Sequence, residues 1–393
     1  MKREILFVFI LFILNLSVSA QKSIDDVLKD IEKNNTSLKV LKTKLEANTY
    51  KANTGKFLSN PTVSVGYNWG DKEISEKKTS YGVSQAIDFP TSYMYRSRKS
   101  KLRVENAKQE YEISRLNVLL ASKQVCINLI YYNLLDKAYE TRLKNANSIV
   151  DIYKKKFNVG EINKIEYNKV QLNLSRVESK VSKIKSEKEV LLNLLKKMNG
   201  GISISFDIDR YKLVKFIDDF KKWYSEIKNL SPELKYLERN IELSKQDVKL
   251  KLALSLPKFS IGYTEEHLSK ETMRGVSFGV SIPLWENKNT VKAARAEVKY
   301  ADSYLKDAEM NHYTKFYNLY EKANKLRETL KGYRKAIKNY NSLELLEKSL
   351  FAKEISLLEY IVEVDYYYDS LSQLYEVEKD LYIIESDLFM YNL

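Results

Sequence analysis

The side chains best suited to catalysis or metal binding are scarce in this sequence and stand far apart. The 393 residues include two histidines, His267 and His312, and one cysteine, Cys126. Neither histidine has a second ligand at the spacing of a zinc site, and Cys126 has no partner for an internal disulfide. No glycine-rich phosphate loop and no nucleophile elbow occurs. We therefore expect no enzyme activity, no metal site and no cofactor, and interpret Cys126 as a small core or seam residue.

Composition and charge point to long helices with solvated faces. The chain carries a net charge of +14 and is 30% charged, yet it has only 11 glycines and 5 prolines. So few chain breakers favour long uninterrupted helices, and most lysines alternate with glutamates as on a water-facing helix. One basic cluster is denser and fits either contact with anionic lipid head groups or solubility alone. Its members are Arg96, Arg98, Lys99, Lys101 and Arg103.

The first 20 residues have the features of a secretory signal peptide. A charged start precedes an apolar run from Ile5 to Leu14, and Val18 and Ala20 supply the small residues of a cleavage site. The run is shorter than the ~20 residues of a spanning helix, which disfavours an uncleaved anchor. An exported protein is not expected to bind nucleic acid. No other apolar run approaches spanning length, so any membrane crossing is expected to use strands.

Two short segments alternate apolar residues with small polar ones. In residues 258–264 and 276–282 apolar residues face one side, and the other side holds mainly Ser and Gly. The same pattern fills residues 62–69 and 82–89. A soluble sheet would turn the apolar face to a core. In a membrane strand that face meets lipid while the polar face lines a lumen.

These two hairpins belong to a tandem duplication of the whole mature chain. Pro61 and Pro257 lie 196 residues apart (257 − 61), and Pro90 and Pro283 lie 193 apart (283 − 90), so the loops differ by three residues. Prolines thus bound both hairpins. We expect a first repeat over 21–201 with its β-hairpin at 61–90 and helical hairpin at 91–199. A connector at 202–222 precedes a second repeat over 223–393, with its β-hairpin at 257–283 and helical hairpin at 287–393.

Helical periodicity accounts for the remainder of each repeat. We expect one helix from Ser23 to Leu58, capped at its start by Ser23 and Asp26. An unbroken stretch from Thr91 to Asn158 predicts a helix on the order of 100 Å long. In the second repeat, apolar residues step three and four apart along a coiled-coil seam. They are Phe316, Leu319, Ala323, Leu326, Leu330 and Tyr333.

Each long helical hairpin is expected to turn at a short tip. In the first repeat Gly160 is suited to the left-handed conformation that ends a helix. In the second repeat the tip falls at Ala352 to Ser356, with Lys353 in the place of Gly160. The fold class is therefore mainly α with a small β part. It combines duplicated long antiparallel coiled-coil hairpins with four β-strands per chain.

Four strands cannot close a membrane barrel, and an open edge is not tolerated in lipid. Several copies would therefore have to pool their strands. Two copies would give eight strands and a filled interior, whereas twelve or more strands could leave a water channel.

The sequence resembles the TolC family of outer-membrane efflux channels over the whole mature chain. The resemblance rests on the order and spacing of several short motifs. They are the four strand-boundary prolines, Ser-Ile-Pro-Leu at 281–284, Ser-Pro-Glu-Leu at 231–234 and Lys-Phe-Asn-Val-Gly at 156–160. It implies a homotrimer in the bacterial outer membrane, with a twelve-stranded barrel in lipid and an α-helical periplasmic tunnel. It also implies docking onto a periplasmic adaptor that joins the channel to an inner-membrane transporter.

The resemblance implies two sets of site residues. The tips would contact the adaptor through Val159, Gly160, Glu161, Ile162, Lys353, Glu354 and Ile355. The tunnel would close near Glu359 and Glu363, where a ring of carboxylates in a narrow pore would bind and select cations. The alternative interpretation of these two glutamates is a solvated pair at helical spacing.

The sequence is compatible with two functions. The favoured one is an export channel that conducts passively, and the alternative is a secreted coiled-coil scaffold or adhesin. Strands of about nine to eleven residues would favour the channel. The cargo, whether drug, metal ion or peptide, is not encoded in any pattern found here.

Overall fold

The computed structural model describes residues 22–69, 77–212, 216–268, 271–339 and 343–393. The expected signal peptide, residues 1–20, lies outside these residues. The described chain is mainly helical with one four-stranded antiparallel sheet. The predicted mainly α class with a small β part is therefore confirmed.

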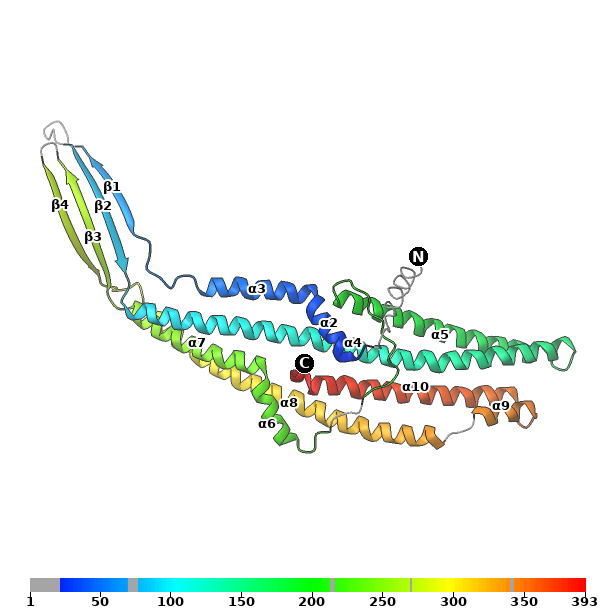
Figure 1. Cartoon of the computed structure of the whole chain (residues 1–393). Coiled ribbons are helices and arrows are strands. Elements are labelled where there is room, and N and C mark those ends of the chain that lie inside the picture. The colour runs from blue at the N-terminus through cyan, green and yellow to red at the C-terminus, as the bar shows by residue number, and fades with distance from the viewer. Residues whose placement is uncertain (1–21, 70–76, 213–215, 269–270, 340–342) are drawn as a thin grey trace, which may run out of the picture. The chain divides into compact units, whose positions relative to one another are not determined.

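The elements of the first repeat follow the expected order (Figure 1). They are α2 (Ile24–Asn34), α3 (Thr36–Ala52), β1 (Thr62–Asn68), β2 (Lys78–Ile87), α4 (Thr91–Asn158) and α5 (Lys164–Met198). Helix α4 has the bounds that the unbroken stretch predicted. Three strands of the sheet have ten residues, within the nine to eleven expected, but β1 has only seven.

The second repeat has the corresponding elements. They are α6 (Phe220–Leu230), α7 (Pro232–Leu254), β3 (Lys258–His267), β4 (Thr272–Ser281), α8 (Thr290–Asn339), α9 (Leu343–Phe351), α10 (Leu357–Leu388) and a 3₁₀ turn (Met390–Asn392). Helix α6 begins at Phe220, inside the segment expected to be the connector. The long helix expected from Asn287 begins at Thr290.

The prediction of one helix from Ser23 to Leu58 was wrong, because the chain breaks at Asn35 between α2 and α3. The Asn35 side-chain oxygen accepts a hydrogen bond from the Leu38 amide at 2.9 Å, which caps α3. Its amide group donates to the Met198 carbonyl at 2.7 Å. The corresponding residue of the second repeat, Ser231, caps α7 in the same way. The duplication therefore contained the signal for this break.

The chain folds into two compact units, and each unit takes residues from both repeats. Unit 1 comprises the described parts of Met1–Leu38, Leu116–Lys221 and Lys315–Leu393, and unit 2 comprises Lys39–Arg115 and Lys222–Thr314. The sequence repeats are therefore not the compact units of the structure.

Unit 1 is built on packed helices. One apolar cluster joins α2, α4, α5 and the connector, through residues such as Ile31, Leu129, Leu195 and Phe206. Cys126 belongs to this cluster and is fully buried, as its interpretation as a core residue requires. A second cluster joins α4, α5, α8 and α10. The residues of the predicted seam on α8 are all buried or half-buried, which confirms that face.

Unit 2 holds the sheet and the helical segments that lead into and out of it. Its helices contact one another through small residues. The buried ones include Ala52, Ala107, Ala253, Ala294, Ser92 and Ser100. Across the contact between α4 and α7, the Asn106 amide donates to the Asn240 side-chain oxygen at 2.5 Å, and Lys99 pairs with Asp247. Small side chains allow the helices to approach closely side by side.

The expectation that no further segment is apolar enough to span a membrane was too strong. Helix α4 is long and apolar enough by length and composition alone. Half of the qualifying window is buried inside the structure, as in the core helix of many soluble proteins. This feature is therefore weak support for a spanning helix.

Candidate functional site

The sheet of unit 2 presents a face that is apolar over most of its rows and is interrupted by Gln85 and by the ion pair of Arg274 with Glu265. Its strands pair in the order β1-β2-β3-β4, and Figure 1 shows them side by side. The register aligns apolar residues of different strands into rows across the sheet. One complete row is Val63, Val83, Tyr263 and Val276, and another contains Ile87, Phe259 and Val280. Val63 is 71% exposed and Phe278 is 79% exposed, so no element that the structure describes covers the face at these positions.

The opposite face interleaves glycine with serine. Gly66 lies beside Ser80, Gly262 beside Ser277 and Gly279 beside Ser260 on neighbouring strands. A Cβ atom added at any of these three glycines would lie 2.4 to 2.8 Å from the serine hydroxyl. The glycines are therefore required for the serine side chains to lie across them. The small polar face predicted from the sequence is present and lies opposite the apolar face.

Two strand edges stay open within the chain. Strand β1 pairs only with β2, and β4 pairs only with β3, among the residues that the structure describes. Each edge presents unpaired backbone groups. An apolar exposed face with two open edges is not a stable arrangement in water for an isolated chain.

The four boundary prolines lie outside the strands, where a missing N–H costs no ladder hydrogen bond. Pro61 and Pro257 immediately precede β1 and β3, Pro90 immediately precedes α4, and Pro283 follows β4. Large exposed side chains flank the same positions. They are Phe57, Leu58, Leu284 and Trp285. Trp69, beyond the other end of β1, is exposed as well, so aromatic residues border the apolar face at both ends.

Both helical tips close with the same hydrogen-bond pattern. In the first tip the Gly160 amide donates to the Phe157 carbonyl at 3.0 Å, and the Glu161 amide donates to the Lys156 carbonyl at 2.9 Å. In the second tip the amides of Lys353 and Glu354 make the two corresponding bonds. Gly160 has φ 78° and Lys353 has φ 63°. This is the Schellman motif, and Lys353 adopts the left-handed conformation despite its side chain.

The tip residues divide into exposed and inward-facing sets. Val159, Gly160, Glu161, Lys353 and Glu354 are exposed. Ile162 and Ile355 instead pack on a cluster formed by α4, α5, α9 and α10. The two isoleucines therefore anchor the tips, and the exposed residues remain accessible to a partner.

Glu359 is part of the cap of α10. The Ser356 amide donates to its carboxylate at 2.7 Å, and the Glu359 amide donates to the Ser356 hydroxyl at 3.2 Å. Hydrogen bonds that the Glu359 carboxyl accepts from the Ser356 backbone and, to a lesser extent, from the Ser356 side chain lower its pKa. The carboxylate is exposed, whereas Glu363, one turn further, is half-buried. The sequence patterns did not reveal this capping box, although Ser356 three residues before Glu359 was the available signal.

An ion-pair network that the sequence did not predict lies within unit 1. Asp365 on α10 pairs with Arg142 on α4 and with Arg176 on α5. The Arg142 guanidinium also lies over the rings of Tyr139 and Tyr368, at 5.5 and 5.0 Å from their centroids. Arg142 and Arg176 lie 223 and 189 residues from Asp365 in the chain, so no local pattern could identify these pairs.

The two histidines and Cys126 form no catalytic arrangement with side chains that the structure describes. His267 contacts Glu265 and Thr272 on the sheet, and the His312 ring faces the Tyr224 hydroxyl at 3.0 Å. Over the described ranges, no group of three His, Cys, Asp or Glu side chains could hold a metal ion. Burial raises the pKa of Cys126 to about 12.

Comparison with known proteins gives similarity in fold but not in sequence. No protein-family sequence model and no curated protein sequence matches the chain. The structure is similar to the CmeC outer membrane channel of Campylobacter jejuni, with a TM-score of 0.76 at 16% identity, over 94% of this chain and 85% of that one.

Two further solved structures are also similar to this chain in fold. The outer membrane protein VceC of Vibrio cholerae has a TM-score of 0.77 at 11% identity, over 94% of this chain and 95% of that one. The open state of the MtrE outer membrane channel of Neisseria gonorrhoeae has a TM-score of 0.74 at 11% identity, over 94% and 88%. The resemblance inferred from the sequence is therefore confirmed at the level of the fold.

Proposed function

We propose that this chain, which has the fold of the TolC family of outer membrane channels, forms an export channel in a bacterial outer membrane. The observation that carries this proposal is the exposed apolar face of the sheet together with its two open edges. Lipid would cover the face, and the β4 edge of one copy would pair with the β1 edge of the next. Each unsatisfied backbone N–H or C=O group along an open edge would cost several kcal/mol in hydrocarbon, so the barrel must close.

The number of copies follows from the size of the lumen. Two copies would pool eight strands, whose interior is filled by side chains, and three would pool twelve. Conduction therefore favours the homotrimer with a twelve-stranded barrel. The serine and glycine face would then line the lumen, where small side chains leave room for passing solutes.

The rest of the chain would form a periplasmic helical tunnel that ends at the tips. Val159, Glu161, Lys353 and Glu354 are exposed there and offer contacts for a periplasmic adaptor. The adaptor would join the channel to an inner-membrane transporter, and the channel itself would conduct passively. No catalytic step and no cofactor is needed for this role.

The proposed gate is the pair Glu359 and Glu363. Because Glu359 also caps α10, an alanine at this position would remove the cap and the charge together. Glutamine keeps the capping box but removes the charge. The informative variant therefore combines Glu359→Gln with Glu363→Gln, and Glu166→Gln at the equivalent position of the first repeat is the matched control.

The test is single-channel conductance of the purified oligomer in a planar bilayer, with its stoichiometry measured by native mass spectrometry. We expect discrete steps from a trimer. Cation selectivity should fall in the double glutamine variant and stay unchanged in the control. Equal selectivity in all three proteins would refute the gate alone. A protein that stays soluble without detergent and gives no conductance steps would refute the channel and favour the scaffold or adhesin.

A further inference from the structure

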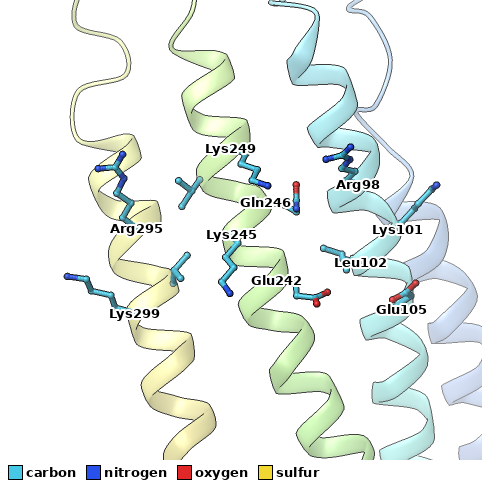
Figure 2. Close-up of a pocket in the computed structure, with 12 residues that line it drawn as sticks. Arg98, Lys101, Leu102, Glu105, Glu242, Lys245, Gln246, Lys249, Arg295 and Lys299 are labelled. Carbon is cyan, nitrogen blue, oxygen red and sulfur yellow. The ribbon is translucent and has the colours of Figure 1, made fainter.

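A groove lined by basic side chains lies among α4, α7 and α8 of unit 2 (Figure 2). Its volume is about 980 Å³. The lining includes six basic side chains and two acidic ones, a balance of +4 (6 − 2). The basic residues are Arg98, Lys101, Lys245, Lys249, Arg295 and Lys299. Figure 2 shows Lys245 and Lys249 on the central helix, between the pairs on α4 and α8.

The cations of this groove are not neutralised within the chain. In the described part of the chain, none of the six forms an ion pair. One of the two lining carboxylates, Glu105, is already engaged by Arg239 at 3.4 Å. By contrast, the neighbouring Arg96 and Lys99 pair with Asp88 and Asp247. The basic cluster seen in the sequence therefore separates into the ion-paired Arg96 and Lys99, the groove-lining Arg98 and Lys101, and Arg103, which does not line the groove.

Helical geometry places Arg98 of the groove on the side of α4 that corresponds to the apolar face of the sheet. Asp88 continues the polar alternation of β2, whereas Phe89 contacts Phe259 of the apolar face, with ring centroids 6.4 Å apart. Arg96 reaches Asp88 and so marks the polar side of α4. Arg98 lies about 200° further around the helix, which places it on the opposite, apolar side.

The depth of the groove matches a membrane boundary. Arg98 lies seven residues after the start of α4, Lys249 five before the end of α7 and Arg295 five after the start of α8. At 1.5 Å per residue these cations lie roughly 7 to 10 Å from the helix ends that adjoin the sheet. That distance is comparable to the head-group layer outside a hydrocarbon core, and long basic side chains extend toward such a layer.

We infer that this groove binds the head groups of anionic phospholipids at the periplasmic boundary of the membrane. The inference rests on the proposed membrane position of the sheet. The groove would hold the phosphate groups through Arg98, Lys249 and Arg295, with Lys101, Lys245 and Lys299 one turn deeper. Binding there would fix the height of the barrel in the membrane.

Lipid selectivity of the reconstituted full-length protein tests the inference. Spin-labelled phosphatidylglycerol and phosphatidylcholine are compared in phosphatidylcholine vesicles, and the immobilised fraction of each gives a relative association constant. We expect a preference for phosphatidylglycerol of about five-fold or more, the effect of one lysine or arginine near an anionic surface. The preference should weaken as salt is added.

Two variants with the same loss of charge separate a groove from a general basic surface. Arg98→Gln with Lys249→Gln removes groove cations, whereas Arg103→Gln with Lys251→Gln removes cations from the other sides of the same helices. The first double variant should bring the preference toward one, and the second should retain it. Equal losses in both variants, or no preference in the wild type, would overturn the inference.

Three combinations of lipid preference and conductance would also overturn it and would identify the reason. If the groove variant changes the anion selectivity of conductance but not the lipid preference, the groove serves anionic solutes in the pore. If neither lipid is immobilised and no conductance appears, the proposed channel itself fails. Normal conductance without lipid preference would refute the groove inference and leave the channel intact.

Discussion

A lysine placed on either face of one strand distinguishes a membrane sheet from a water-facing one. Val276 and Ser277 are neighbours on β4, and their side chains point to opposite faces. Val276 belongs to the apolar row with Val83 and Tyr263, and Ser277 lies beside Gly262. Val276→Lys and Ser277→Lys add the same charge at nearly the same depth. They differ only in the face that receives it.

The expected free-energy cost of Val276→Lys follows from the position of Val276 in its strand. It is the fifth of the ten residues of β4, close to the middle of the strand and of the proposed membrane span. A lysine on the lipid side at the midplane costs about 2 to 4 kcal/mol, or roughly 6 to 12 kcal/mol over three copies. Ser277→Lys would face the lumen and cost little. In water, Val276 is already 63% exposed, so either lysine would change stability by only about 0.5 kcal/mol.

The assay is insertion of urea-unfolded protein into lipid vesicles, followed by the fraction that becomes resistant to external protease. We expect Val276→Lys to lose insertion and Ser277→Lys to insert like the wild type. Val276→Thr controls for loss of the valine side chain without added charge. Equal insertion of both lysine variants, or a larger defect in Ser277→Lys, would refute the assignment of the apolar face to lipid.

Three further predictions concern unit 1. Lys353→Gly should raise the free energy of unfolding by about 1 kcal/mol, because glycine adopts the left-handed conformation without a Cβ penalty. Thermal unfolding measures this gain in stability. Arg142→Met should lower the free energy of unfolding by about 3 to 5 kcal/mol, because it leaves Asp365 without its buried partner. Arg176→Met should lower it by less than about 1 kcal/mol. Urea unfolding measures both losses. Cys126 should resist alkylation at pH 8 in the folded protein, because its raised pKa keeps the thiol protonated. The same thiol should react after unfolding. Mass spectrometry of iodoacetamide adducts measures the extent of alkylation in both states.

Each of these predictions has a result that would contradict it. A lower stability of Lys353→Gly would mean that the lysine side chain contributes more than its backbone strain costs. The Arg142 side chain is 8% exposed and that of Arg176 is 65% exposed, so equal losses would show that burial does not set the strength of these pairs. Rapid alkylation of folded protein would show that helix α4 opens locally around Cys126.

The sequence by itself determined those features that depend on neighbours along the chain. Alternation in β4 identified its two faces, and the unbroken run to Asn158 identified the end of α4. The duplication placed Lys353 opposite Gly160 and so located both tips. The break at Asn35 was missed, although Ser231 in the second repeat signalled it. These features follow from residue periodicity and capping, which act over a few residues.

Only the tertiary structure decided which distant segments meet. The pairing of β2 with β3 joins two hairpins into one sheet and aligns their apolar rows. Helix packing brings Arg142 to Asp365 and divides the basic cluster between ion-paired Lys99 and groove-facing Arg98. Such contacts depend on how whole elements pack and on which backbone groups remain unpaired. No local period encodes them, because helix and strand patterns identify a face but not the partner that covers it.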